Sequence, residues 1–310
     1  MEIVVLGCGT SSSVPSVRCL LTRDCKVCGE AQANPDSKNR RLNPSLLIRN
    51  LQTNTNVLVD CGKTFREAVL RIFPRIGVSA VHSVLLTHDH ADACLGLDDL
   101  KEVLPVVDPV AEESYQIPPE PMKVHCNSDT SRSLRTRFPH LIEEPPPMLT
   151  ESCLTKESLH WATKLELDVF KPWERFEAGG MEFLSLPVIH GAKYTSIGFE
   201  FGYELGVRVV YISDVSEFLE ETRAYLNDAC KPRIDVVIID ALYIVRHHNT
   251  PMSLLEVIER IKTIRPRVTL LTGMSHEFDF YAHSDVVAEM GEETGLRVAM
   301  AYDAMRLMFP

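Results

Sequence analysis

The sequence has little that would suit a membrane or an extended nucleic-acid surface. No apolar run reaches the roughly 18 residues that a bilayer-spanning helix needs. Acidic residues outnumber basic residues by 43 to 32, so the formal net charge is −11 and no broad basic surface for nucleic acid is expected. The first residues, MEIVVLGCGT, have no basic segment before the apolar run, so we expect no secretion signal.

Repeats and low-complexity tracts are also missing, and a disulfide framework is not expected. The nine cysteines are an odd number, and without a secretion signal they indicate reduced thiols or metal ligands in a cytoplasmic protein. The 310 residues are 45% hydrophobic and 24% charged, which is typical of a globular protein. We expect a single domain over residues 1–310, with an insertion or surface loop near residues 141–175.

Short β-rich runs alternate with helical patterns along the chain. Residues 45–48 and 57–60 are typical of a hairpin around a polar loop. Residues 234–240 form a fully apolar run, and Ser253 with Glu256 predicts a capping box at the start of a helix over 253–264. Because strand and helix patterns alternate regularly toward the end of the chain, we expect an α/β fold with sheets covered by helices.

The strongest chemical signal lies directly after a predicted strand at 81–87. His88 and His90 are one residue apart, and Asp92 follows two residues later. In an irregular loop both imidazoles can converge on one ion, and imidazole suits borderline divalent cations such as zinc. Two solvated histidines in a turn are the alternative, but the position after a buried strand and the nearby acid favour a metal site.

A second group of candidate ligands lies near the start of the chain. Cys25 and Cys28 are separated by two residues, and Cys19 lies upstream, which gives three thiolates at a spacing typical of zinc sites. A fourth sulfur or nitrogen donor would complete a closed structural site, and three reduced cysteines without an ion are the alternative. Such a zinc knuckle at 19–28 would contribute folding energy and no catalysis.

These motifs together resemble a known superfamily. His88-x-His90-x-Asp92 resembles the H-x-H-x-D-H motif of the metallo-β-lactamase superfamily, and the Gly-rich opening turn at 7–11 and Asp60 in the run 58–62 match its first two motifs. The cysteines and the segment 272–276 more narrowly resemble the PhnP-type cyclic phosphodiesterases, a branch near tRNase Z. The resemblance implies a four-layer αββα sandwich of two mixed sheets covered by helices.

The resemblance also implies a set of ligands. At the active site it implies Zn²⁺ or Mn²⁺ on His88, His90, Asp92, His190 and Asp214, and at the knuckle a structural Zn²⁺ on Cys19, Cys25, Cys28 and His276. A shifted active-site role for His276 is the less favoured alternative.

The sequence departs from the family pattern at three positions. Ala93 and Gly273 stand where the family has histidines, and both of those histidines serve a second metal, so we expect one tightly bound active-site ion and at most a weak second one. Asp98 or Asp99 could replace a missing ligand of the second metal. The alternative is that both acids lie in solvent at the start of a helix. Pro251 stands where PhnP-type enzymes have a catalytic histidine, and nearby His247 or His248 is the candidate substitute.

The expected function is that of a hydrolase that uses a metal-activated water. Asp92 would hold or deprotonate the water and His248 would act as the general acid. We expect a phosphodiesterase that acts on a small cyclic or nucleotide-type phosphodiester. The sequence leaves open whether the protein forms a homodimer. The alternatives are a lactonase, a thioesterase or a tRNA 3′-processing nuclease on the same scaffold, or a non-catalytic nucleotide- or metal-binding relative.

Overall fold

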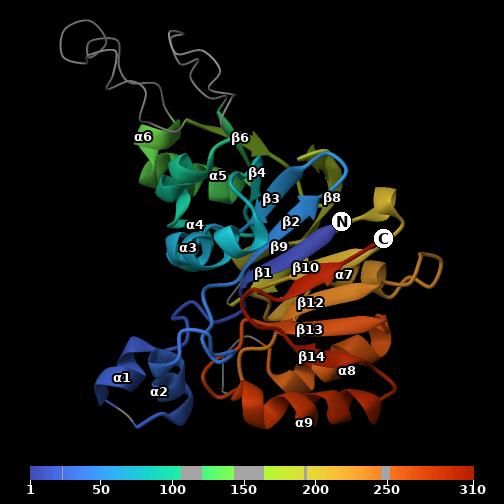
Figure 1. The fold of residues 1–310 in the computed structure, drawn as a ribbon. Helices are drawn as coiled ribbons and strands as arrows, with labels where there is room; N and C mark the ends of the chain where they lie inside the picture. Colours follow the sequence, from blue (N-terminus) through green and yellow to red (C-terminus); the bar gives the residue numbers. More distant parts are fainter. Residues whose placement is uncertain (23, 106–120, 143–163, 192–193, 246–251) are drawn as a thin grey trace, which may run out of the picture.

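Two mixed β-sheets pack face to face in the computed structural model, and helices lie on their outer sides (Figure 1). The structure describes residues 1–22, 24–105, 121–142, 164–191, 194–245 and 252–310. The expected fold class, two mixed sheets covered by helices, is therefore confirmed.

The first sheet has seven strands and the second has eight. In spatial order the first contains β15 (Arg306–Met308), β1 (Glu2–Gly7), β2 (Ser45–Asn50), β3 (Thr55–Val59), β4 (Ser83–Leu85), β5 (Met122–Cys126) and β6 (Leu165–Val169). The second contains β11 (Glu217–Phe218), β8 (Met181–His190), β9 (Tyr194–Phe201), β10 (Val209–Ile212), β12 (Val236–Asp240), β13 (Val268–Thr272) and β14 (Val298–Met300), and β7 (Arg175–Ala178) pairs with β8.

The helices of the described part of the chain are mostly short. They are α1 (Val17–Thr22), α2 (Lys26–Ala33), α3 (Phe65–Ile76), α4 (Ala91–Cys94), α5 (Ser128–Arg137), α6 (Pro139–Ile142), α7 (Glu220–Leu226), α8 (Leu254–Ile264) and α9 (Phe280–Glu292), with 3₁₀ turns at η1 (Leu97–Val103) and η4 (Tyr203–Leu205). None of these helices is long and apolar enough to cross a membrane. The predicted capping box of Ser253 and Glu256 is present at the start of α8.

Strand β1 shows how the sequence builds a sheet that is buried on both faces. Successive side chains of a strand point to opposite faces. Ile3 and Val5 pack into the core between the sheets, whereas Val4 and Leu6 pack into a second core with α3 on the outer face. An unbroken apolar run is therefore required, because neither face of the strand meets solvent.

Each sheet has a parallel part whose strands end at a common edge. Strands β3, β4 and β5 are parallel, as are β10, β12 and β13. Residues that follow these strands thus gather where the two sheets meet, which is where ligands commonly bind in α/β folds. This edge carries the candidate site.

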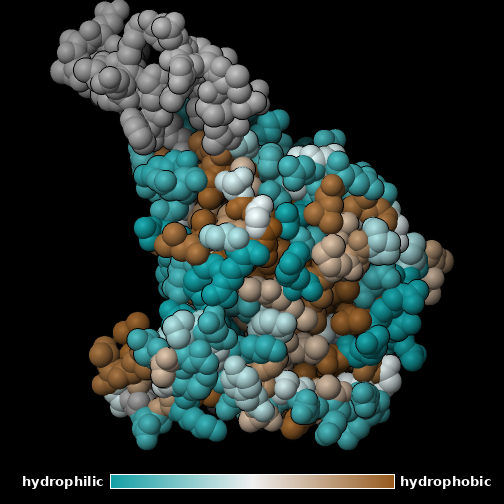
Figure 2. Space-filling view, viewed as in Figure 1, coloured by the Kyte–Doolittle hydropathy of each residue, from teal (hydrophilic) through white to brown (hydrophobic). Residues whose placement is uncertain are grey.

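Helices α1 and α2 form a small lobe that projects from the sandwich (Figure 1). The buried side chains of the lobe form a separate small cluster of five residues, Val14, Cys19, Val27, Cys28 and Ala31. Apolar side chains of α1, including Val17 and Leu21, are exposed, and the lobe shows apolar surface in Figure 2. So small an apolar cluster supplies little stabilisation by itself.

Part of the range 141–175, which was expected to be an insertion or a surface loop, belongs to the first sheet. Within it, Leu165–Val169 forms β6, which pairs in parallel with β5 and extends the first sheet. Residues 143–163 lie outside the described part of the chain. The run LELDV alternates three apolar side chains with two acidic ones, a pattern typical of a half-buried strand that the sequence analysis did not use.

Candidate metal centre

Three histidines from the two sheets meet at the common strand edge. His88 and His90 follow β4 of the first sheet, and His190 ends β8 of the second. One ring nitrogen of each lies within 4.8 Å of those of the other two. The ring centroids are 4.6 Å apart for His88 and His90, and 5.0 Å apart for His90 and His190. The structure thus brings together histidines that are about a hundred residues apart in the chain.

The ring nitrogens of this group fit a cation. Nε2 of His88 and Nδ1 of His190 are buried and have no hydrogen-bond partner among the described residues. Burial lowers the pKa of His88 to about 3 and also lowers the pKa of His190, so both rings stay neutral with a free lone pair at neutral pH. Nε2 of His190 lies 3.3 Å from Nδ1 of His90, so these two nitrogens face each other. Buried polar atoms are nearly always paired, so the unpartnered Nε2 of His88 in the same group fits a bound cation.

Asp60, the second motif residue, supports the histidine loop. It lies directly after β3 and accepts hydrogen bonds from the Thr87 backbone N–H at 2.9 Å and from the Thr87 hydroxyl at 2.9 Å. The Thr87 oxygen lies 2.8 Å from Nδ1 of His88. Since the hydroxyl proton points to Asp60, Nδ1 of His88 donates to the hydroxyl oxygen, and the lone pair of His88 is left on Nε2, the orphaned atom.

His90 is held by a different set of contacts and is exposed to solvent. Its ring stacks on Tyr194 at 5.1 Å between centroids. The Tyr194 hydroxyl donates to the carboxylate of Asp89, which also forms an ion pair with Arg137 at 3.3 Å. Exposure of His90 leaves this side of the three-histidine group open to small molecules.

Three aspartates border the histidines. Asp92 lies in α4, Asp214 follows β10, and Asp240 ends β12. Burial raises the pKa of all three, and repulsion from Asp214 raises the pKa of Asp92 and of Asp240 further. Asp92 and Asp214 were predicted ligands, and they lie close enough to the histidines for their charges to interact. Neither belongs to the compact 4.8 Å group among the described residues.

Asp240 was missed by the sequence analysis. Its local pattern is that of an acid at the end of an apolar strand, which carries no spacing signal. The signal that could have found it is topological, because β10 and β12 are parallel neighbours and their ends lie side by side. Asp240 and the segment that holds Asp214 therefore leave the sheet at the same edge.

The four predicted knuckle ligands also lie together. Sγ of Cys19, Cys25 and Cys28 lies 3.1, 3.4 and 3.7 Å from Nδ1 of His276. All four ligand atoms lie within 4.8 Å of one another. His276 therefore lies with the cysteines and not with the three-histidine group. This is the position that the favoured prediction gave to it.

Other candidates have ordinary structural environments. Asp98 is exposed and pairs with Lys101, which agrees with a solvated helix start. His247, His248 and Pro251 lie outside the described residues, so the predicted general acid stays a prediction.

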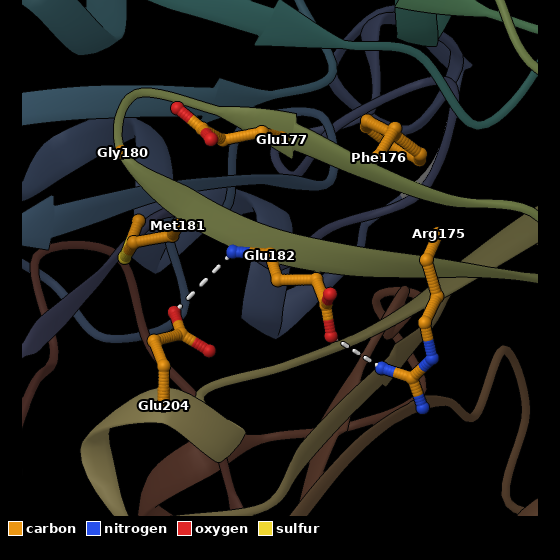
Figure 3. A pocket seen from close by; sticks show the side chains of 7 residues that line it. All are labelled: Arg175, Phe176, Glu177, Gly180, Met181, Glu182 and Glu204. Atoms are coloured by element: carbon orange, nitrogen blue, oxygen red, sulfur yellow. Dashed lines mark hydrogen bonds and ion pairs between the residues drawn. The ribbon is translucent and has the colours of Figure 1, made fainter.

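A separate hollow of about 360 Å³ lies over the β7–β8 hairpin (Figure 3). It is at the end of β8 opposite His190, and its charged lining consists of Glu177, Glu182, Glu204 and Arg175. Arg175 is already paired with Glu182, and the lining has no imidazole or thiol. This hollow is therefore distinct in place and chemistry from the three-histidine group.

Comparisons with known proteins agree with this architecture. The crystal structure of a diphosphatase from the PhnP family has a TM-score of 0.72 at 24% identity and covers 100% of this chain and 98% of its own. Zn(2+)-bound PqqB from Methylobacterium extorquens has a TM-score of 0.69 at 15% identity, with 100% of both chains covered. The short form of human tRNase Z has a TM-score of 0.55 at 15% identity, again with 100% of both chains covered. At these identities the similarity establishes the fold.

Two comparisons of the sequence identify the family to which the chain belongs. An octanoyltransferase of Porphyromonas gingivalis (strain ATCC BAA-308 / W83) is 25% identical over 276 residues, which is 89% of this chain and 46% of that protein. The chain thus spans about half the length of this curated relative. The family described as Beta-lactamase superfamily domain matches residues 55–274, most of the chain and both strand-end histidine segments. The chain therefore belongs to the β-lactamase superfamily.

Proposed function

We propose that this protein is a metal-dependent hydrolase whose active-site ion is held by His88, His90 and His190, with Asp214 beside them. The observation that carries the proposal is the group of three imidazoles with one ring nitrogen of each within 4.8 Å of the others, among which Nε2 of His88 is buried and unpartnered. A divalent ion there would lower the pKa of a coordinated water from about 15.7 toward roughly 7 and would neutralise developing charge on a substrate oxygen.

The chain's own residues supply the remaining roles in this proposal. Asp92 orients the attacking water and accepts its proton, and burial raises the pKa of its carboxyl above the ordinary value. Thr87 and Asp60 fix the tautomer of His88. His248, placed by sequence alone, donates a proton to the leaving alkoxide, which is worth roughly 10²–10⁴ in rate.

A small phosphodiester is the proposed substrate class. Similarity in fold to a PhnP-family diphosphatase and to tRNase Z supports a phosphate ester. The net charge of −11 opposes a long polyanion and favours a small substrate that reaches the histidines past the exposed His90. Zn²⁺ or Mn²⁺ is the proposed active-site ion, and a second Zn²⁺ on Cys19, Cys25, Cys28 and His276 is structural.

The test compares substrate classes with one enzyme preparation. Zinc- or manganese-loaded protein is assayed with bis(p-nitrophenyl) phosphate, a lactone and an acyl thioester, with the thioester included because the Porphyromonas relative is named for octanoyl transfer. We expect hydrolysis of the phosphodiester, its loss to background in His88→Ala, and its retention in His140→Ala, an exposed histidine away from the group. Turnover of the lactone or thioester alone, or of none, contradicts the phosphodiesterase proposal.

A further inference from the structure

The ring of Tyr194 lies beside all three imidazoles of the candidate centre. Its centroid is 5.1 Å from that of His90 and 6.2 Å from those of His88 and His190. It is stacked on His90, with 20° between the ring planes, and lies edge-on to the other two, with angles of 70° and 83°. This one side chain therefore forms a common wall of the group, although the sequence analysis gave it no role.

Tyr194 is placed here by the hairpin of β8 and β9. It is the first residue of β9 and pairs across the hairpin with His190, the last residue of β8. His90 belongs to the loop that follows β4 of the other sheet. The hairpin thus carries one imidazole of the group together with the ring that stacks on another. The stack therefore joins the two halves of the group, which come from different sheets.

The hydroxyl of Tyr194 is bound by Asp89, the residue between the two histidines of the loop. It donates to Oδ1 of the Asp89 carboxylate and accepts from the Asp89 backbone N–H at 3.3 Å. Arg137 of α5 pairs with Oδ2 of this carboxylate at 3.3 Å and also donates to the Asp89 carbonyl oxygen. Hydrogen bonds to an ionised acceptor are stronger than neutral ones. The loop that carries the histidines therefore holds the Tyr194 ring in a fixed orientation.

His90 depends on this contact more than its neighbours do on theirs. His88 is fully buried, and Asp240 is packed so closely that a Cβ on Gly273 would lie 1.5 Å from its Oδ1. His90 is exposed, and within the described ranges Tyr194 is the one aromatic ring outside the group that contacts it. An exposed side chain keeps more rotamer freedom than a buried one, and that freedom is lost when a ligand must hold one geometry.

We propose that Tyr194 is a positioning residue of the metal centre, which holds the exposed His90 ring in its ligand geometry and is itself held by Asp89. This inference rests on the proposed function, because His90 is one of the ligands named there. Tyr194 acts through His90, since its hydroxyl is engaged by Asp89. Outer partners that orient a metal ligand typically contribute about 10- to 100-fold in metal affinity.

The test separates the stack from the hydroxyl and measures metal binding instead of turnover. Protein stripped of metal is titrated with Co²⁺, whose visible absorption reports the coordination geometry, while thiolate-to-metal charge transfer marks the knuckle separately. Tyr194→Phe keeps the ring and loses the hydroxyl, and should lower the Co²⁺ affinity of the three-histidine group by about tenfold. Tyr194→Leu also loses the stack, so it should lower this affinity further and alter the visible bands of the histidine-bound ion.

Matched variants locate the effect. Asp89→Asn, which keeps the shape of the side chain and loses its charge, should resemble Tyr194→Phe. Tyr203→Phe, just beyond the opposite end of β9, should leave both sites unchanged. The thiolate bands of the knuckle should stay the same in every variant. Unchanged Co²⁺ binding in Tyr194→Leu, or an equal loss of binding at the knuckle, overturns the positioning role.

Failure of this inference and failure of the proposed function give different results. Hydrolysis of the phosphodiester together with unchanged metal binding in Tyr194→Leu would contradict the positioning role alone. The expected losses of Co²⁺ affinity in a protein that hydrolyses no phosphodiester would contradict the proposed function alone.

Discussion

The orientation of His88 depends on two residues that do not touch the proposed ion. Asp60 and Thr87 form a short hydrogen-bonded chain that ends at Nδ1 of His88. Asp60 itself has a left-handed backbone with φ of 60°, a conformation that costs about 1–3 kcal/mol in residues other than glycine. A strained residue at this point is consistent with a carboxylate held in place for the site.

Removing the Thr87 hydroxyl should therefore weaken zinc binding at the three-histidine group. In Thr87→Val the His88 ring loses its hydrogen-bond acceptor, and outer partners of this kind typically contribute about 10- to 100-fold in metal affinity. Competition with a chromophoric chelator measures the change. Thr136→Val on the exposed face of α5 is the matched control. An unchanged affinity in Thr87→Val would show that the hydroxyl does not orient the ring.

A second residue-scale prediction concerns Asp303, which is buried beside the opening Gly-rich turn. Its carboxylate accepts hydrogen bonds from the backbone N–H groups of Cys8 at 3.2 Å and Leu42 at 2.9 Å. Burial nevertheless raises the pKa of Asp303 from 3.8 to about 6. The folded protein thus holds this proton at pH values where the unfolded chain has lost it.

The stabilising contribution of Asp303 should fall as the pH rises from about 4 to about 6, because the unfolded chain binds fewer protons than the folded protein in that window. Asp303→Asn mimics the neutral acid. Denaturant unfolding of this variant and of the unmodified protein at several pH values therefore gives the contribution of Asp303 to the free energy of unfolding. We expect the difference in free energy of unfolding between the two to shift in favour of the variant across this window and to level off above it. A difference that shifts the other way would contradict the raised pKa.

Residues of the candidate site differ in how far the sequence could predict them. His88, His90 and Asp92 share one loop, so local spacing indicates them directly. His190 and Asp214 lie in other strands, and only the resemblance to a family connected them to that loop. Asp240 escaped both approaches, because strand order, which places it beside Asp214, depends on long-range pairing and is not written in any local pattern.

At the scale of elements, the lobe of α1 and α2 is the part least able to stand alone. The two helices have six and eight residues, which is shorter than an isolated helix needs in water. The lobe contacts the sandwich through the isolated bridge from Val14 to Arg41 and through the three thiols around His276. Arg40 also donates to the Ala31 carbonyl of α2. Metal at the knuckle would supply folding energy that the small apolar cluster lacks.

Cys28→Ser should therefore loosen the lobe without dissolving the sandwich. We expect one fewer tightly bound zinc per chain, together with faster amide hydrogen exchange over residues 14–33 and little change in the strands. Mass-spectrometric hydrogen exchange measures both regions in one experiment. Cys230→Ser, at an exposed cysteine, is the control. Unchanged exchange in the lobe of Cys28→Ser would contradict a structural zinc.

Elements with strong periodicity were predicted well and weak ones were not. The β2–β3 hairpin, β12 and α8 agree with the patterns read from the sequence. The edge strands β11 and β15 were missed, because they have only two and three residues and take their conformation from the neighbouring strand. Their conformation depends on tertiary contacts that no window of sequence contains.

A cluster of phenylalanine rings lies in the core between the two sheets. Phe199 of β9 is fully buried and meets Phe170, which follows β6, at 5.9 Å between ring centroids. It also meets Phe176 of β7 at 6.2 Å, with both rings edge-on to it. These rings join the second sheet to the far end of the first.

Phe199→Ala should lower the free energy of unfolding by about 3–5 kcal/mol, because it removes a ring from a closely packed interior and leaves a cavity. Leu70→Ala on the exposed side of α3 should change it by less than about 0.5 kcal/mol. Denaturant titration gives both values. A loss below about 1 kcal/mol in Phe199→Ala would indicate that the sheets are joined elsewhere.

The contact between Gly273 and Asp240 also constrains how this centre can change by mutation. With a Cβ at 273 only 1.5 Å from Oδ1 of Asp240, histidine cannot enter position 273 while that carboxylate keeps its place. Shortening Asp240 first opens the space, whereas the reverse order passes through a chain with a steric clash in its interior. The effect of a substitution at position 273 therefore depends on the residue at position 240. A histidine can be introduced at 273 only after Asp240 has been replaced by a smaller residue.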